Sequence, residues 1–234
     1  MKSRRTLTIW LVALVMTAFA LNWIYQVVRK PAELLFPVSG TLAKTPAETW
    51  AQYAPLFRRY STALISAELL AALAQVEGAG DPAARPPWRW RASTDPREIY
   101  RPASSAVGMY QITDGTFSQA KRYCIRENAV LEEGCWFNGL YLRVIPSHSV
   151  ELTSAFLDRR VAALLARHRA SVSTEQKHNL AALIHLCGAS AGETYVRRGF
   201  RLADRQRCGE HDVRAYLARV NAMKRVFARL AALG

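Results

Sequence analysis

The chain has 234 residues, half of them hydrophobic, and a formal net charge of +14 at pH 7. This length suits one domain with an anchor segment, and the hydrophobic content is enough for a sizeable core. A positive field of this size attracts polyanions, so nucleic acid, anionic lipid headgroups and the carboxylate-bearing cell wall are candidate partners, and basic partners are excluded.

Residues 1–30 predict a signal-anchor. Three basic residues precede an uncharged run of 23 residues from Thr6 to Val28, and Arg29 and Lys30 follow it. The run is long enough to span a bilayer, although it contains Ala18–Ala20, an A-x-A pattern typical of signal-peptidase sites. We expect a periplasmic protein anchored in the inner membrane by this helix. The alternative is a cleaved signal peptide and a soluble periplasmic protein.

The four cysteines fit an oxidising compartment. Four cysteines allow three pairings, and the sequence does not choose among them. We expect two local disulfides, Cys124–Cys135 and Cys187–Cys208, because each would close one loop. A zinc site is the rival interpretation, but neither C-x-x-C nor clustered Cys/His spacing occurs. No metal and no cofactor is therefore predicted.

The first half of the body predicts a linker and two helices. Residues 31–45 carry Pro, Ser and Gly and are expected to be a linker, and residues 46–234 to form the folded domain. Helical patterning begins near Pro46, with one apolar face made by Trp50, Tyr53, Leu56 and Phe57. The next helix, "STALISAELLAALAQVE", is capped by Ser61 or Thr62 and is apolar nearly all round, which predicts a central buried helix.

The second half predicts one irregular loop and four more helices. Asp81–Ala106 contains five prolines, five arginines and two tryptophans, and is expected to be a long ordered surface loop. Helices are expected at Gly115–Tyr123 capped by Asp114, from Val150, from Ser173 with a capping box, and from Glu210 to Gly234. Because no long alternating pattern occurs, the fold class is all-α, or mainly α with at most a short hairpin.

The stretch "LLAALAQVEGAGDP" ends an apolar helix with a single carboxylate, Glu77, before two glycines and a proline. A carboxyl group at the poorly hydrated end of a helix is suited to protonate a leaving oxygen in glycoside cleavage. An ordinary glutamate in the last turn of a helix is the alternative, so a second signal is needed.

That signal is "SSAVGMYQITDGTF", which lies after the loop. Together the two segments resemble the lysozyme-like domain of the soluble lytic transglycosylase (SLT) family, whose cleft-lining segment matches Ala106–Thr113 and whose helix-start threonine matches Thr116. The resemblance covers Leu64 to Ala120 well and the later helices loosely. It implies a lysozyme-like helical fold with Glu77 as the catalytic residue and a substrate-binding segment made by Gly108, Met109, Tyr110 and Gln111.

Each of these residues has a physical use at a glycan site. Gly108 lets backbone approach a sugar, Met109 and Tyr110 offer apolar surface, and Gln111 offers a donor and an acceptor. Further substrate contacts are expected from Trp90, in the arginine-rich loop, and from Tyr195, which follows the glycines that end a helix. Ordinary packing is the alternative for both.

The chain departs from the family pattern at named positions. Gly78 stands where the family usually has serine, Tyr110 replaces a common methionine, and the loop between the two motifs is longer. The family's third motif, A-Y-N-x-G, aligns with Ile184–Gly188, where only the glycine matches. His185 takes the tyrosine position, and we interpret it as a core histidine.

No convincing second acid accompanies Glu77, since Asp81, Asp95 and Asp114 each fit a turn or a cap. The resemblance implies a one-acid mechanism, in which Glu77 protonates the glycosidic oxygen and then accepts a proton from the C6 hydroxyl of the sugar. The expected function is thus a peptidoglycan lytic transglycosylase that cleaves the MurNAc–GlcNAc bond and leaves 1,6-anhydro ends. Local wall opening for a secretion or conjugation apparatus is a suggested setting.

Two other functions stay open: a muramidase-type hydrolase, and a non-catalytic glycan-binding subunit of an envelope-spanning secretion or conjugation machine. The expected partners are peptidoglycan strands and, through the N-terminal helix, the inner membrane. Nucleic acid is not expected, because the chain carries an export signal and no nucleic-acid-binding motif.

Overall fold

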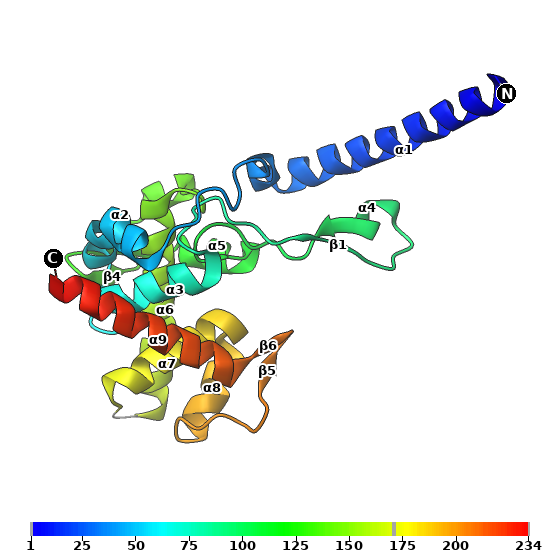
Figure 1. The fold of residues 1–234 in the computed structure, drawn as a ribbon. Helices are drawn as coiled ribbons and strands as arrows, with labels where there is room; N and C mark the ends of the chain where they lie inside the picture. The colour runs from blue at the N-terminus through cyan, green and yellow to red at the C-terminus, as the bar shows by residue number, and fades with distance from the viewer. Residues whose placement is uncertain (1, 170–171, 234) are drawn as a thin grey trace.

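The computed structural model describes residues 2–169 and 172–233, and its fold is mainly α-helical, as predicted (Figure 1). Three short hairpins accompany the helices. The α-helices are α1 Lys2–Arg29, α2 Pro46–Arg59, α3 Ala67–Gly78, α4 Pro96–Ile99, α5 Asp114–Ala120, α6 Pro146–His168, α7 Thr174–Cys187, α8 Ala189–Arg197 and α9 Val213–Leu233. Two 3-10 helices, η1 Pro31–Leu35 and η2 Trp136–Leu140, complete the helical part.

Helix α3 is the centre of the core, which confirms the prediction of a central buried helix. Every side chain from Leu69 to Ala74 is completely buried. The helix packs against α2, α9 and α6, and it lies between α2 and α9 in Figure 1. Because α3 is apolar on all sides, it can be covered on all sides, and its C-terminal end is held in a fixed position.

Several predicted helix boundaries are wrong by a few residues. The N-cap of α3 is Ser66, whose hydroxyl accepts from the Leu69 N–H, because Thr62 instead caps a local turn and donates to Asp158. The cap of α5 is Thr113 and not Asp114. Helix α6 begins four residues before Val150, at Pro146, whose fixed φ suits a first helical position.

The structure contains three two-stranded antiparallel hairpins, more than the single short one allowed by the sequence. They pair β1 Trp88–Trp90 with β2 Tyr100–Pro102, β3 Cys124–Arg126 with β4 Ala129–Leu131, and β5 Arg207–Cys208 with β6 His211–Asp212. The last of these replaces the expected start of α9 at Glu210. Strands of two or three residues are too short to show an alternating pattern, so the sequence gives no strand signal for them.

The segment 81–106 is therefore not a plain loop. Its first strand pairs with its second so that Trp90 lies opposite Tyr100, and the short helix α4 connects them. We call Trp88–Pro102 the arm. Figure 1 shows the arm projecting from the helical body alongside α1. Cross-strand aromatic contact and packing on α1 stabilise a segment that the proline count marked as irregular.

The predicted disulfides are confirmed. Cys124–Cys135 and Cys187–Cys208 are both formed, each with Cα atoms 5.5 Å apart. The first joins the start of β3 to the segment that follows β4 and so encloses this hairpin, and the second ties strand β5 to the C-terminal end of α7. The pairing is consistent with an oxidising compartment.

The N-terminal helix and residues 31–45 complete the chain. Arg4–Arg29 is long and apolar enough to cross a membrane, and its most apolar stretch is not buried in the domain, whereas Gln26 near its end is buried. The expected linker packs on the domain: the Gly40 N–H donates to Asp81 at 2.6 Å and the Lys44 N–H to the Ala79 carbonyl at 2.8 Å. This segment thus connects α1 to α2 and also contacts the turn that follows α3.

Candidate active site

Glu77 lies in the last turn of α3, where the apolar core ends. The helix stops because Ala79 adopts a left-handed conformation, with φ of 51°, and its N–H turns back to the Ala74 and Gln75 carbonyls. Gly80 also has positive φ, and a Cβ there would collide with the Thr49 side chain. The Glu77 side chain keeps 17% exposure, so it is largely dry and still accessible from one side.

Two side chains from other helices meet the Glu77 carboxylate. The Tyr216 hydroxyl, from the first turn of α9, donates to Glu77 Oε1 at 2.5 Å. The His185 imidazole, from the last turn of α7, places Nε2 3.8 Å from the same oxygen. This distance is too long for a hydrogen bond, but it allows electrostatic attraction when the ring is protonated. Three helix ends therefore converge on one carboxyl group.

Tyr216 is suited to a permanent donor role. Its side chain is almost completely buried, and burial together with the neighbouring Glu77 carboxylate raises its pKa well above the usual value of a tyrosine. The phenol therefore stays protonated and keeps donating to Oε1. Among the described residues Oε2 has no hydrogen-bond partner. The arrangement fixes one carboxylate oxygen and leaves the other available to exchange a proton.

The neighbouring motif approaches Glu77 through its backbone. A Cβ on Gly78 would lie 2.9 Å from both the Cα and the carbonyl oxygen of Met109, so only glycine fits at this contact. This close approach leaves no room at position 78 for the serine that the sequence resemblance would lead one to expect. The turn from Val107 to Ile112 is closed by a bridge between these two residues, and its Met109 backbone packs directly against the end of α3.

The expected roles of this turn are corrected by the burial of its side chains. Met109 and Tyr110 are completely buried and offer no side-chain surface to a sugar. Gln111 is partly buried, and its amide donates to the Ala84 and Gly108 carbonyls at 3.1 and 2.9 Å. At Gly108, φ is +81° and a Cβ would collide with the Arg143 carbonyl oxygen, so this glycine serves the packing of two backbone segments.

Trp90 and Tyr195 do not join the Glu77 cluster. Trp90 lies on the arm, with its ring 4.6 Å from that of Tyr100, and Figure 1 shows this strand well separated from α3. Tyr195 is buried on α8 against Phe200, with ring centroids 5.5 Å apart, and it lines a pocket of about 460 Å³ bordered by α7 and α9. The expected contact of Trp90 with substrate at Glu77 is not supported by this placement.

The three other acids considered near Glu77 all have structural partners. Asp81 is buried and accepts from the Gly40 and Ala83 N–H groups. Asp95 caps α4 and pairs with Arg97, and Asp114 pairs with Arg143 at 2.7 Å. None of them is hydrogen-bonded to Glu77 in the part of the chain that the structure describes.

Sequence reasoning missed Tyr216 and undervalued His185. Tyr216 lies 139 residues from Glu77 and occupies an ordinary apolar position of an amphipathic helix, so no local signal marks it. His185 did carry a signal, because it occupies the tyrosine position of the third motif. Within residues 2–169 and 172–233 no group of three His, Cys, Asp or Glu side chains is arranged to hold a metal.

Comparison with known proteins adds no assignment. No family model matches the chain, and no curated protein sequence matches it.

Proposed function

We propose that this protein is a peptidoglycan lytic transglycosylase of the SLT type. The observation that carries the proposal is the single, largely buried carboxyl group of Glu77, held through one oxygen by Tyr216. The proposal also draws on the two sequence motifs, which the fold brings into backbone contact at Gly78 and Met109.

The chemistry requires one group that first gives and then takes a proton. Protonated Glu77 donates from Oε2 to the glycosidic oxygen as its bond to MurNAc C1 breaks. The resulting carboxylate accepts the proton of the MurNAc C6 hydroxyl while O6 bonds to C1, which closes the 1,6-anhydro ring. The Tyr216 hydrogen bond to Oε1 keeps the carboxyl plane oriented through both steps. No water is consumed, and Glu77 ends in its starting state.

The structural partners of the three acids considered beside Glu77 favour this proposal over a hydrolase. Retaining and inverting glycosidases place a second carboxyl group within about 5 to 10 Å of the first. Asp81, Asp95 and Asp114 are each held by structural partners instead. A one-acid reaction in which the substrate supplies its own nucleophile needs no such partner.

The location belongs to the same proposal. The apolar helix α1 and the two disulfides support a periplasmic domain anchored in the inner membrane. The net charge of +14 would hold the domain near the carboxylates of peptidoglycan stem peptides. We further propose that the enzyme opens the wall locally for an envelope-spanning apparatus.

The test is product analysis by mass spectrometry after digestion of purified sacculi with the full-length protein. We expect muropeptides that end in 1,6-anhydroMurNAc and are lighter by one water than the hydrolysis products. Reducing MurNAc ends would identify a muramidase instead. Binding to sacculi without release of soluble fragments would identify a non-catalytic glycan-binding subunit, and either result would overturn the proposal.

A further inference from the structure

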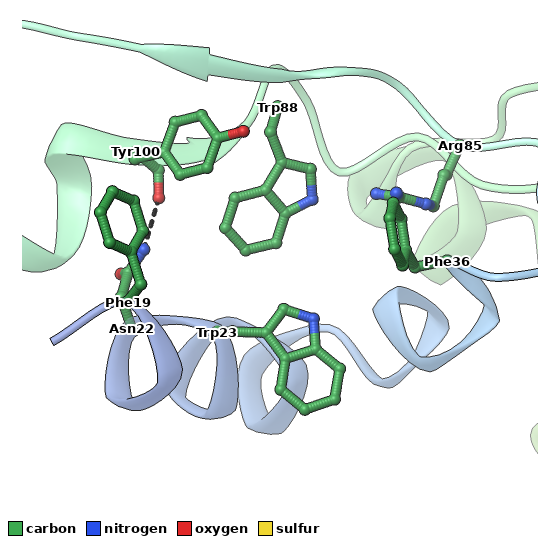
Figure 2. A pocket seen from close by; sticks show the side chains of 7 residues that line it. All are labelled: Phe19, Asn22, Trp23, Phe36, Arg85, Trp88 and Tyr100. Atoms are coloured by element: carbon green, nitrogen blue, oxygen red, sulfur yellow. Dashed lines mark hydrogen bonds between the residues drawn. The ribbon is translucent and has the colours of Figure 1, made fainter. Parts of the chain in front are cut away.

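A cavity of about 340 Å³ lies between α1 and the arm. Its lining is unusually aromatic, as Figure 2 shows: Trp23 and Phe19 come from α1, Trp88 and Tyr100 from the arm, and Phe36 follows η1. Arg85 closes one end and lies over the Phe36 ring at 4.7 Å. Because the Arg85 charge is paired with Glu33 at 2.6 Å, the cavity is mainly apolar in character and suits an acyl chain.

The arm is bonded to α1 through the polar side chains of an otherwise apolar helix. Asn22 donates to the Tyr100 carbonyl and Gln26 to the Arg97 carbonyl, both at 2.7 Å. An amide side chain surrounded by lipid is costly unless it is hydrogen-bonded. The arm supplies these two acceptors, so it and the last turns of α1 form one unit.

The depth of this unit follows from the length of α1. A hydrocarbon core of about 30 Å takes roughly 20 helical residues at 1.5 Å each. Counted from Arg5, such a span ends near Tyr25. Phe19, whose ring lies 6.1 Å from that of Trp90, is then inside the apolar layer, and Asn22 lies near its edge. The part of the arm that is hydrogen-bonded to Asn22 and Gln26 therefore lies at the membrane surface.

The exposed side of the arm has the chemistry of a membrane interface. Trp90 is 66% exposed although it is large and aromatic. Tryptophan at the boundary of headgroups and acyl chains is favoured because its ring is apolar and its N–H is polar. Arg91 beside it is exposed and, among the described residues, has no ion pair. Its charge complements an anionic headgroup.

We propose that the arm and the C-terminal third of α1 form a membrane-interface site that binds phospholipid, with preference for anionic headgroups. An acyl chain enters the aromatic cavity, Trp90 inserts beside Phe19, and Arg91 contacts the headgroup phosphate. The site fixes the height and orientation of the domain above the bilayer. It rests on the proposed membrane insertion of α1 and is independent of the chemistry at Glu77.

The test is site-specific photo-crosslinking of the full chain. A benzophenone amino acid replaces Trp90 in protein reconstituted into phosphatidylcholine vesicles with or without phosphatidylglycerol. We expect a peptide carrying a phospholipid adduct, with phosphatidylglycerol enriched over its share of the vesicle. The matched control replaces Trp136, an 80% exposed tryptophan on η2 that has no described contact with α1. Its lipid adduct should be about fivefold weaker or absent, because it lies outside the interface.

Other outcomes overturn the proposal. A crosslink from position 90 to a second copy of the chain would identify a self-association surface, and a crosslink to another protein in native membranes would identify a protein partner. Equal lipid adducts at positions 90 and 136 would show only unspecific proximity to the bilayer.

Charge reversal gives a second, independent measurement. Arg91→Glu should abolish the enrichment of phosphatidylglycerol at position 90, whereas Arg198→Glu, at an exposed arginine directly after α8, should leave it unchanged. Release of soluble fragments from sacculi in detergent should be unaffected by Arg91→Glu. Lipid enrichment tests the membrane-interface site, and fragment release tests the proposed enzyme. Because the two are measured separately, failure of one proposal can be distinguished from failure of the other. Unchanged enrichment in Arg91→Glu would contradict the headgroup contact.

Discussion

Two buried glutamates in different parts of the molecule have contrasting surroundings. Glu33, in η1, is completely buried between two cations, with Arg85 at 2.6 Å and Lys30 at 3.0 Å, and it also accepts from the Trp88 indole at 2.8 Å. Glu77 contacts one neutral hydroxyl at hydrogen-bond distance and retains a free oxygen and a path to solvent. Burial alone therefore does not mark a reactive acid.

The difference lies in what the partners allow. Lys30 and Arg85 stabilise a fixed anion, and Glu33 joins the segment after α1 to the start of the arm. The Tyr216 hydroxyl orients Glu77 without supplying a full positive charge, and it leaves Oε2 without a hydrogen-bond partner among the described residues. The proposed proton exchange at Glu77 fits these surroundings, since no lysine or arginine pairs with it among the described residues, whereas Glu33 has one of each.

The largest effect is expected from a substitution of Glu77, the acid with the proposed function. Glu77→Gln keeps the shape of the side chain but cannot transfer a proton. Release of muropeptides from sacculi should fall by about 1000-fold, the scale of general acid–base catalysis. The melting temperature should stay close to that of the wild type, as measured by circular dichroism. Retained activity in this variant would remove Glu77 from the mechanism.

The same substitution at Glu33 tests the glutamate that has a structural role. Glu33→Gln leaves Lys30 and Arg85 buried without their anion, which should cost about 3 kcal/mol of unfolding free energy. Denaturant unfolding in detergent measures this loss. Glu98→Gln is the control, since that carboxylate pairs with Arg29 and Arg101 at a more exposed position and should change stability by about 1 kcal/mol or less. Equal losses in both variants would contradict the distinction drawn from burial.

Removal of the Tyr216 hydroxyl tests whether its hydrogen bond orients the Glu77 carboxyl group. Tyr216→Phe preserves packing and frees the carboxyl group to rotate, so kcat should fall about 10- to 100-fold, the usual effect of lost orientation. KM for glycan strands should not change, because the hydroxyl faces Glu77. Tyr53→Phe, at a buried position on α2, is the control and should retain full activity. A rise in KM with constant kcat would assign Tyr216 to substrate binding.

The backbone contact beside Glu77 gives a smaller effect. Gly78→Ala places a Cβ 2.9 Å from the Met109 backbone, which neither segment can avoid without moving. We expect a loss of about 2 kcal/mol, the usual cost of overpacking. Gly115→Ala, on α5, meets no atom within 4 Å and should be neutral or slightly stabilising. A neutral Gly78→Ala would show that the turn at Met109 is adaptable.

The smallest effect concerns a third buried group, His178 on α7. Burial, reinforced by Lys224 and Lys177 against the opposing Glu68, lowers its pKa to about 4. The unfolded chain binds this proton near pH 6.5, so stability should fall by about 1–2 kcal/mol as the pH drops from 6.5 to 5. His178→Gln should flatten this slope in urea titrations at several pH values. A slope unchanged by the substitution would assign the acid sensitivity to other groups.

Local sequence patterns predicted the helical framework well because its physical causes are local. The apolar run of α3 dictates burial on all sides, and the capping box at Ser173 marks the start of α7. The close spacing of the cysteines favoured the two disulfide pairs that the structure contains. The caps of two helices were predicted at Thr62 and Asp114, whereas the structure has them at Ser66 and Thr113. Both members of each pair are residue types that cap helices, so the sequence does not show at which of them the helix begins.

The sequence by itself thus determined a mainly helical protein, an apolar N-terminal helix and an acid at the end of a buried helix. Only the tertiary structure decided what surrounds that acid. Tyr216 and His185 reach Glu77 because α9 and α7 pack around α3, and Met109 and Tyr110 turn into the core instead of toward a ligand. The arm likewise packs on α1, because it carries the acceptors for Asn22 and Gln26. Local patterns encode burial and helix ends, whereas partners contributed by distant segments depend on packing that no single segment specifies.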